Sequence, residues 1–274
     1  MTDAGASFRS FEQAGWEDKA VAGRYDSHLS SVTNQAIDAL LEAAAIRSGS
    51  RVLDVATGAG YVASAAAQRG AEVTGIDFSE LQVQMARERY PALRFEQADA
   101  EALPFEPGTF DAVVNAFGMC HFPHPESALS ESLRVLKRGG RIAFTVWDVP
   151  ERSIAFGALY AAIRAHGSLD VGLPAGPNFF LFSDPEYATR ALLSAGFVSP
   201  TCRQVLQTWR VSDPDEVFQT FIEGTVRAAA TIRAQTPGAR EAIRAAMRAA
   251  VSAYKRGAYC EIPSPAVLAT AVKP

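Results

Sequence analysis

The sequence predicts an α/β protein built on a doubly wound, mostly parallel sheet. Strand-like apolar runs alternate with helix-like runs along residues 51–147, the order expected when helices cover both faces of a parallel sheet. Acidic residues lie in or just after the ends of three successive predicted strands, and a glycine-rich turn follows the first strand. In open α/β sheets, ligands bind at these carboxyl ends of strands. Apolar residues make up 48% of the 274-residue chain and charged residues 20%, enough for a full core.

Five strands and the helices between them account for the first half of the predicted sheet. The strands are expected at 51–55, 72–76, 93–97, 110–115 and 141–147. The first helix, 61–69, ends at Gly70, a residue favoured just past a helix. Ser79 and Gln82 form a capping-box pattern that begins the second helix before Pro91. A third helix is expected at 126–137.

The flanking segments are predicted to be mostly helical. Residues 1–44 are expected to form an N-terminal helical lid, because Ile37, Leu40 and Leu41 recur at helical spacing. Residues 45–150 form the predicted ligand-binding core, and 151–274 complete the sheet. Within the last part, 148–183 is expected to be irregular, and a helix starts at Asp184-Pro185 and ends at Gly196.

Two further strands bring the predicted sheet to seven, at 202–211 and 267–272. Between them, residues 215–256 are expected to form two long alanine-rich helices, separated by Thr236-Pro237-Gly238. Because these helices lie between the last two strands, they are predicted to form a cap inserted into the sheet near the C-terminus.

Composition argues against several functional classes. A net charge of −4 does not give the basic surface that nucleic acid requires. The three cysteines are scattered without a Cys-x-x-Cys pair, so neither a disulfide framework nor a metal site is expected. We find no signal peptide and no apolar run of membrane-spanning length. We therefore expect a reduced, cytoplasmic protein without nucleic acid or membrane insertion, and the sequence leaves a homodimer open.

The segment Asp54-Val55-Ala56-Thr57-Gly58-Ala59-Gly60 joins the first strand to a helix. Glycine permits a tight turn and close approach of the backbone to a ligand, and the helix N-terminus behind it offers free N–H groups. A dinucleotide-binding loop would do the same, but its third glycine is replaced by Ala63. Glycines at such turns also serve packing alone, so the loop needs support from other residues.

Acidic residues after the next two strands give this support. Asp77 ends the second strand, where a carboxylate can accept both hydroxyls of a ribose. Asp99 follows the third strand and is placed to accept from an exocyclic amine such as that of adenine. Each acid alone also fits a helix cap or loop. Together with Asp54, they favour a ligand that contains a nucleoside.

Five segments in this order carry a family resemblance. VLDVATGAG, VTGIDFS, ADAEALPF, FDAVV and RVLKRGGRIAF resemble the class I S-adenosylmethionine-dependent methyltransferases, most closely the menaquinone/ubiquinone C-methyltransferase-like branch. The resemblance is strong over residues 45–150. It departs from the commonest pattern at Ala56, where many members carry the first glycine of the loop. It implies a Rossmann-like fold and S-adenosylmethionine as cofactor.

The resemblance also implies a set of cofactor-binding residues in the lid and after the first four strands. The loop 54–60 would hold the methionine and ribose, 77–78 the ribose and adenine, 99–100 the adenine, and 115–117 the end with the reactive methyl. The predicted residues are Tyr25, Asp54, Ala56, Gly58, Gly60, Asp77, Phe78, Asp99, Ala100, Asn115, Ala116 and Phe117.

His121 is the candidate catalytic residue, because it follows the fourth strand near the expected position of the methyl group. A histidine there can act as general base on a hydroxyl or an acidic carbon, or it can order the loop by packing. Tyr25 and His28 are candidates for the rim of the lid, or for aromatic anchors. The run 179–182, Phe-Phe-Leu-Phe, is a candidate wall of an apolar substrate pocket or a packing contact of the cap.

These observations predict methyl transfer from S-adenosylmethionine to a carbon or oxygen nucleophile of a small apolar or aromatic metabolite. One alternative is a protein of the same fold that binds the cofactor but catalyses a different reaction. Another is an NAD-dependent oxidoreductase, which would share the glycine loop and Asp77. That class calls for a third glycine at position 63 and has no evident use for Asp99.

Overall fold

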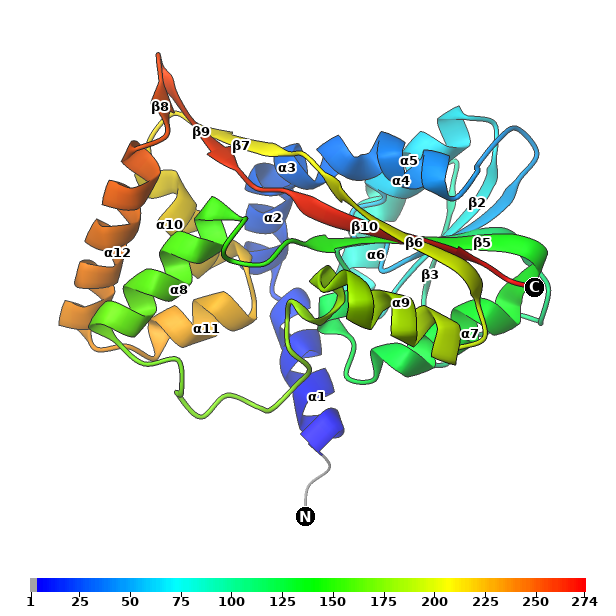
Figure 1. Ribbon diagram of the computed structural model, residues 1–274, viewed down its shortest axis with the longest axis horizontal. Helices are drawn as coiled ribbons and strands as arrows, with labels where there is room; N and C mark the ends of the chain where they lie inside the picture. The colour runs from blue at the N-terminus through cyan, green and yellow to red at the C-terminus, as the bar shows by residue number, and fades with distance from the viewer. Residues whose placement is uncertain (1–3) are drawn as a thin grey trace.

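The computed structural model describes residues 4–274 and contains a seven-stranded sheet covered by helices on both faces (Figure 1). The strand order is β3-β2-β1-β4-β5-β10-β6. Strands β1 to β5 are parallel, and β10 runs antiparallel to both of its neighbours. The strands are β1 Arg51–Val55, β2 Glu72–Asp77, β3 Arg94–Gln97, β4 Phe110–Ala116, β5 Leu136–Trp147, β6 Val198–Val205 and β10 Ala266–Val272. The doubly wound, mostly parallel fold predicted from the sequence is confirmed.

Successive residues of each central strand pack into the core on opposite faces of the sheet. Val52 and Val114 pack with α4 (Ile37–Ala43), α5 (Tyr61–Gln68) and α6 (Glu80–Arg89). Leu53 and Val113 face α7 (Pro125–Val135) and α9 (Pro185–Ser194) on the other side. Because side chains alternate across a strand, burial on both faces gives these strands their continuous apolar runs. The carboxyl ends of β1 and β4 are thereby held rigidly beside each other.

The N-terminal segment is helical, as predicted. It comprises α1 (Ala4–Trp16), α2 (Lys19–His28), α3 (Ser30–Thr33) and η1 (Asn34–Ala36) before α4. The Asp18 side chain caps α2 by accepting from the backbone N–H groups of Ala20 and Val21. Figure 1 shows α1 and α2 between the sheet and the helices at its left. The lid therefore lies where it can contact both the core and the cap.

The prediction that 148–183 is irregular is wrong for α8 (Ile154–His166). Its buried residues Ala155, Phe156, Leu159, Ala162 and Ile163 follow helical spacing. A Cβ at Gly157 would meet the Pro150 carbonyl oxygen at 2.5 Å. The glycine therefore permits close packing of the helix on the preceding turn, rather than marking a loop.

The cap contains three helices over 215–256, not the two long helices predicted: α10 (Asp215–Gly224), α11 (Arg227–Arg233) and α12 (Pro237–Ser252). Helix α10 ends because Thr225 is extended, with φ −131° and ψ 159°. A Cβ at Gly224 would lie 3.0 Å from the backbone nitrogen of Tyr25. This glycine therefore allows α10 to approach α2.

The segment 202–211, predicted as one strand, is divided between two sheets. Strand β6 ends at Val205, and β7 (Thr208–Val211) joins β9 (Tyr259–Pro263) and β8 (Lys255–Arg256) in a small sheet that the sequence did not reveal. Val205 pairs with Ala266 and Thr208 with Pro263. The pairing thus continues past the break, and a two-stranded ribbon connects the main sheet to the cap (Figure 1).

Candidate cofactor-binding and active site

The loop between β1 and α5 has the left-handed backbone that its glycines suggested. The φ angles of Gly58 and Gly60 are 53° and 85°, values that glycine adopts without strain. A Cβ at Gly60 would lie 3.0 Å from the rings of Phe95 and Tyr90, so this glycine packs against the core. Ala56 also has a positive φ, 54°. Such strain in a non-glycine residue is concentrated at functional sites.

Asp54 supports this loop from beneath and keeps one oxygen without a partner. Its side chain is buried, and Oδ2 accepts from Thr57 Oγ1 at 2.6 Å and from the Ala63 N–H at 3.0 Å. Oδ1 is buried and lacks a hydrogen-bond partner among residues 4–274. Burial raises the Asp54 pKa to about 7 against the opposing effect of these hydrogen bonds. A ligand that donates a hydrogen bond to Oδ1 would satisfy an otherwise costly buried acceptor.

Asp77 lies at the end of β2 beside the same loop. Its Oδ2 accepts from the Gly58 N–H and its Oδ1 from the Ser79 N–H, both at 3.0 Å. The side chain is only 5% exposed, and burial raises its pKa to about 6 despite these two donors. Each carboxylate oxygen has two lone pairs, so Asp77 can accept further hydrogen bonds from a ligand.

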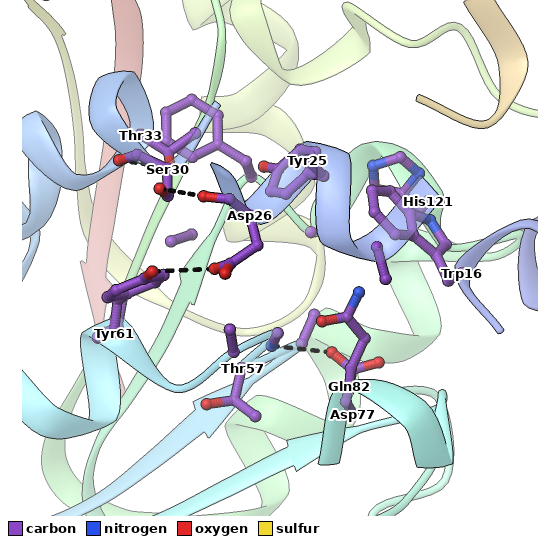
Figure 2. Close-up of a pocket in the computed structure, with 18 of the residues that line it drawn as sticks. Trp16, Tyr25, Asp26, Ser30, Thr33, Thr57, Tyr61, Asp77, Gln82 and His121 are labelled. Atoms are coloured by element: carbon purple, nitrogen blue, oxygen red, sulfur yellow. Dashed lines mark hydrogen bonds between the residues drawn. The ribbon is translucent and has the colours of Figure 1, made fainter. Parts of the chain in front are cut away.

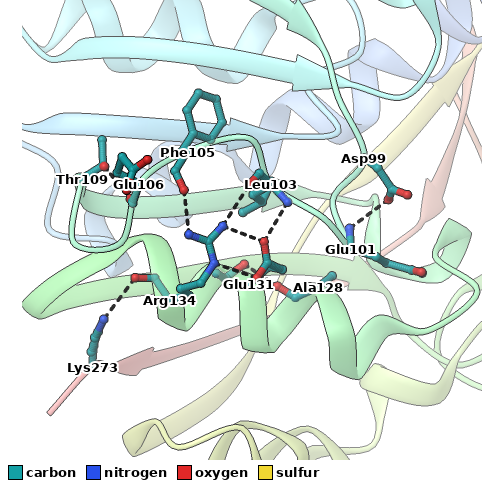
Figure 3. Close-up of polar contacts among 11 residues, drawn as sticks. Asp99, Glu101, Leu103, Phe105, Glu106, Thr109, Ala128, Glu131, Arg134 and Lys273 are labelled. Atoms are coloured by element: carbon teal, nitrogen blue, oxygen red, sulfur yellow. Dashed lines mark hydrogen bonds and ion pairs between the residues drawn. The ribbon is translucent and has the colours of Figure 1, made fainter.

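The segment after β3 is fixed to α7 by a polar network (Figure 3). Glu131 accepts from the Leu103 N–H at 2.8 Å, and Arg134 donates to the carbonyl oxygens of Leu103 and Phe105. Asp99 Oδ1 accepts from the Glu101 N–H at 2.9 Å. The segment that carries Asp99 and Ala100 is therefore preorganised.

The end of β4 forms a tight turn that Asn115 organises. Its side-chain amide donates to the Val55 carbonyl oxygen at 2.8 Å, and its oxygen accepts from the N–H groups of Gly118 and Met119. Phe117 is held at φ 59°, a strained conformation for an aromatic residue. Asn115 thus joins β1 to β4, while the next two residues face the ligand site.

Two adjoining cavities bring most of the predicted residues together, the larger with a volume of about 110 Å³ (Figure 2). Both are lined by Ala56, Asp77, Phe78, His121 and Phe122. The predicted residues that line one or both are Tyr25, Ala56, Gly58, Asp77, Phe78, Asp99, Ala100, Ala116 and Phe117. Asp54, Gly60 and Asn115 lie behind the walls and support them. Their roles toward the cofactor stay predictions.

The lid contributes polar groups to the larger cavity, of which sequence analysis predicted Tyr25 but not Asp26. Asp26 accepts from the Tyr61 hydroxyl at 2.9 Å and from both terminal nitrogens of Arg89 at 2.9 and 2.6 Å. Tyr25 is partly buried beside it, and this burial raises the pKa of its hydroxyl. The one local signal for Asp26 was the position of its partner Tyr61 immediately after the glycine loop.

His121 is enclosed by the lid and by the loop before η3 (Leu181–Ser183). Its Nδ1 lies 2.8 Å from Glu12 Oε2 of α1, and Glu12 is only 2% exposed. The Trp16 and Phe179 rings meet the imidazole edge-on, with centroids at 5.2 and 6.0 Å. Burial opposes protonation, but Cys120 and Glu12 outweigh it and raise the His121 pKa well above its ordinary value. A raised pKa favours the form of His121 that donates a proton over the form that accepts one, and its catalytic role stays a prediction.

Aromatic residues connect this site to the cap. Phe156 of α8 lies 5.6 and 5.4 Å from Phe179 and Phe180, and 5.1 Å from Phe221 of α10. Through Trp147 at 5.5 Å, the cluster reaches Phe117. Residues 179–182 line neither cavity, and the contacts of Phe179 and Phe180 instead match the alternative prediction, that the run packs the cap.

Comparison with known proteins agrees with this geometry. Residues 53–144 match the family described as Methyltransferase domain. An uncharacterized protein of Mycobacterium tuberculosis is 35% identical over 187 residues, 66% of each chain. Demethylmenaquinone methyltransferase of Thermus thermophilus is 43% identical over 132 residues, 46% of this chain and 58% of that protein. The chain thus spans about two thirds or less of the length of these relatives.

A solved structure extends the similarity of fold to nearly the whole chain. Phosphoethanolamine N-methyltransferase 2 of Haemonchus contortus has a TM-score of 0.61 at 21% identity, over 98% of this chain and 60% of that one. The chain belongs to the class I S-adenosylmethionine-dependent methyltransferases. Within that class it resembles the demethylmenaquinone methyltransferases. The cofactor of the class, S-adenosylmethionine, fits a site with an unpartnered Asp54 oxygen and a Gly58 backbone facing the cavity.

Two features are absent from residues 4–274. No helix in this part of the chain is long and apolar enough to cross a membrane. No group of three or more His, Cys, Asp or Glu side chains in it is arranged to hold a metal ion.

Proposed function

We propose that this protein transfers the methyl group of S-adenosylmethionine to a carbon or oxygen nucleophile of a small apolar or aromatic metabolite. The observation that carries the proposal is the convergence of the glycine loop with Asp77 and Asp99 on two joined cavities. A purely structural role for these acids does not explain why both face a cavity.

The proposed binding of the cofactor follows from the hydrogen-bond donors and acceptors around the two cavities. Asp77 would accept the ribose hydroxyls, and Phe78 with Ala100 would cover the adenine. The left-handed turn at Ala56–Gly58 would lie against the methionine part, and Asp54 Oδ1 would take a hydrogen bond from its amino group or from a bridging water. When bound, the sulfonium supplies a methyl group already activated for transfer. The protein's own task is to align the nucleophile and exclude water.

The apolar wall favours the proposed substrate class. Trp16, Ile37 and Phe117 line the larger cavity, and the aromatic cluster around Phe156 adjoins it. The relative named demethylmenaquinone methyltransferase matches 46% of this chain. It therefore supports the proposed cofactor more than the proposed substrate. A cytoplasmic location, the absence of nucleic acid partners and a homodimer stay predictions.

Calorimetric titration of the full chain with S-adenosylmethionine, with NAD as the matched comparison, tests the cofactor. We expect micromolar binding of S-adenosylmethionine and none of NAD. Binding of NAD alone would refute the proposal. A protein that binds the cofactor but catalyses another reaction is distinguished by incubating the complex with isotope-labelled methyl donor and a panel of phenols, quinols and enols. Label must then appear in a product.

A further inference from the structure

The buried carboxylate of Glu12 needs a positive partner. A charge removed from water is strongly destabilising unless it is paired, and Glu12 is 2% exposed. Among residues 4–274, Glu12 forms an ion pair with His121. The nearest arginine on α1, Arg9, instead pairs with Asp99 and Glu101. His121 would neutralise Glu12 if the imidazole carried the proton, with Nδ1–H donating to Oε2 across their 2.8 Å contact.

The surroundings of His121 fix its orientation as well as its charge. Trp16 packs against the ring at an interplanar angle of 87° and Phe179 at 79°, so the imidazole is held between the lid and the loop before η3. Glu12 engages one ring nitrogen and leaves the other, Nε2, for other partners. His121 lines both cavities, so it is in reach of a bound molecule.

Several titratable groups surround His121. Those on its own turn, on α1, on β2 and in the segment after β3 are Cys120, Glu12, Arg9, Asp77, Asp99 and Glu101. Most are acidic, and Arg9 is already paired with two carboxylates. The electrostatic environment of the imidazole is thus negative, which favours its cationic form.

We propose that Glu12 positions His121 as a proton-bearing hydrogen-bond donor, and that the substrate presents to it an ionised oxygen on an apolar ring, as in a phenolate or enolate. This rests on the function proposed above and names its substrate class. Glu12 is a positioning residue, because it acts through His121. The lid helix supplies it, so the donor is complete only when α1 is docked. A general base at this position is not part of the proposal.

The first test measures the charge of His121 in the full chain with S-adenosylhomocysteine bound, from the NMR shifts of isotope-labelled histidine ring nitrogens. The His121→Asn variant assigns the signal. We expect a protonated ring at neutral pH in the native protein. In Glu12→Gln, the ring should lose this proton at a pH about one unit or more below that of the native protein. Glu17→Gln is the matched control, since Glu17 follows α1 and binds the Glu80 N–H instead. A neutral ring in the native protein, or the same titration in Glu12→Gln, overturns the proposal.

The second test measures whether the site favours an ionised oxygen. para-Nitrophenol, whose phenol and phenolate forms differ in absorbance, is titrated into the same complex, and nitrobenzene is the uncharged comparison. We expect the bound dye to ionise at lower pH than the free dye, and phenolate affinity to fall about tenfold in Glu12→Gln, with nitrobenzene unchanged. Glu12→Asp, which keeps the charge, should restore part of the effect if Glu12→Gln folds poorly.

Unchanged ionisation of the bound dye, or no saturable dye binding, overturns the substrate class. The cofactor titration separates this failure from failure of the proposed function. If S-adenosylhomocysteine binds and the dye result is negative, only the inference about Glu12 and His121 is wrong. If neither cofactor form binds, the proposed function is wrong and this inference with it.

Discussion

At Asp77, one carboxylate orders two backbone segments and faces both cavities. Replacing it with alanine is expected to weaken S-adenosylmethionine binding about tenfold or more, since a charge-assisted hydrogen bond contributes about 1.5–3 kcal/mol. Calorimetry measures the change. Asp38→Ala is the control, because Asp38 lies on the exposed side of α4 and pairs with Arg69. Unchanged affinity of Asp77→Ala would contradict the ribose assignment.

The raised pKa values of Asp54 and Asp77 predict a pH dependence of binding. Burial raises them to about 7 and about 6, so both carboxyls are largely protonated in the free protein at pH 5. A ligand that donates to them requires the ionised form. Affinity should therefore rise with pH between about 5 and 8 and then level off, with proton release on binding. Calorimetry in buffers of different ionisation enthalpy measures the release, and proton uptake would contradict the assignment.

Residues at strand ends were predictable from the sequence, whereas Glu12 was not. Asp54 and Asp77 lie near the ends of recognisable strands and Asp99 follows one, and parallel strands bring their carboxyl ends to one edge. Glu12 has no local signal, because its partner His121 is 109 residues away in the chain. Its role depends on how α1 docks, which neither helix pattern nor composition encodes.

At the scale of elements, the turn after β4 depends on a glycine that has no room for a side chain. A Cβ at Gly118 would meet Asn115 Nδ2 at 2.3 Å and the Ala56 Cβ at 2.7 Å. Gly118→Ala is therefore expected to destabilise the protein by about 1–3 kcal/mol and to weaken cofactor binding. Denaturant unfolding and calorimetry check both effects. In Gly238→Ala the added methyl meets nothing within 4 Å, and a similar loss there would refute the steric explanation.

The lid offers a fluorescence signal, because Trp16 at the end of α1 lines the larger cavity. Cofactor binding should change the emission of the native protein and have little effect in Trp16→Phe. Trp147 and Trp209, which are buried and absent from the linings of both cavities, provide the constant background. An equal response in Trp16→Phe would mean that α1 does not contact the bound cofactor.

The element boundaries that sequence analysis missed share a cause. Gly157 and Gly224 lie in or at the end of helices because neighbouring backbone approaches them, from Pro150 and from Tyr25. The break at Leu206 and Gln207 is fixed by distant contacts, since Gln207 accepts from the Ser264 N–H and donates to the Val32 carbonyl oxygen. Such tertiary contacts override local propensity.

At the scale of the whole molecule, the aromatic cluster centred on Phe156 joins cap and core. Phe156→Ala should lower the free energy of unfolding by about 3–5 kcal/mol, the usual cost of removing a buried aromatic ring. Because Phe156 lines neither cavity, cofactor affinity should be unchanged below the unfolding temperature. Thermal unfolding and calorimetry together check this, and a selective loss of cofactor binding would show that the cluster shapes the site.

The two-stranded ribbon between sheet and cap makes residues 208–263 a replaceable cassette. They leave and re-enter beside one another, at the paired residues Thr208 and Pro263, and the main sheet closes independently through the pairing of Val205 with Ala266. A different helical unit whose ends match this spacing would leave the strand order and the glycine loop intact. Because no residue of this cassette lines either cavity, chimaeras that exchange it should retain their cofactor site.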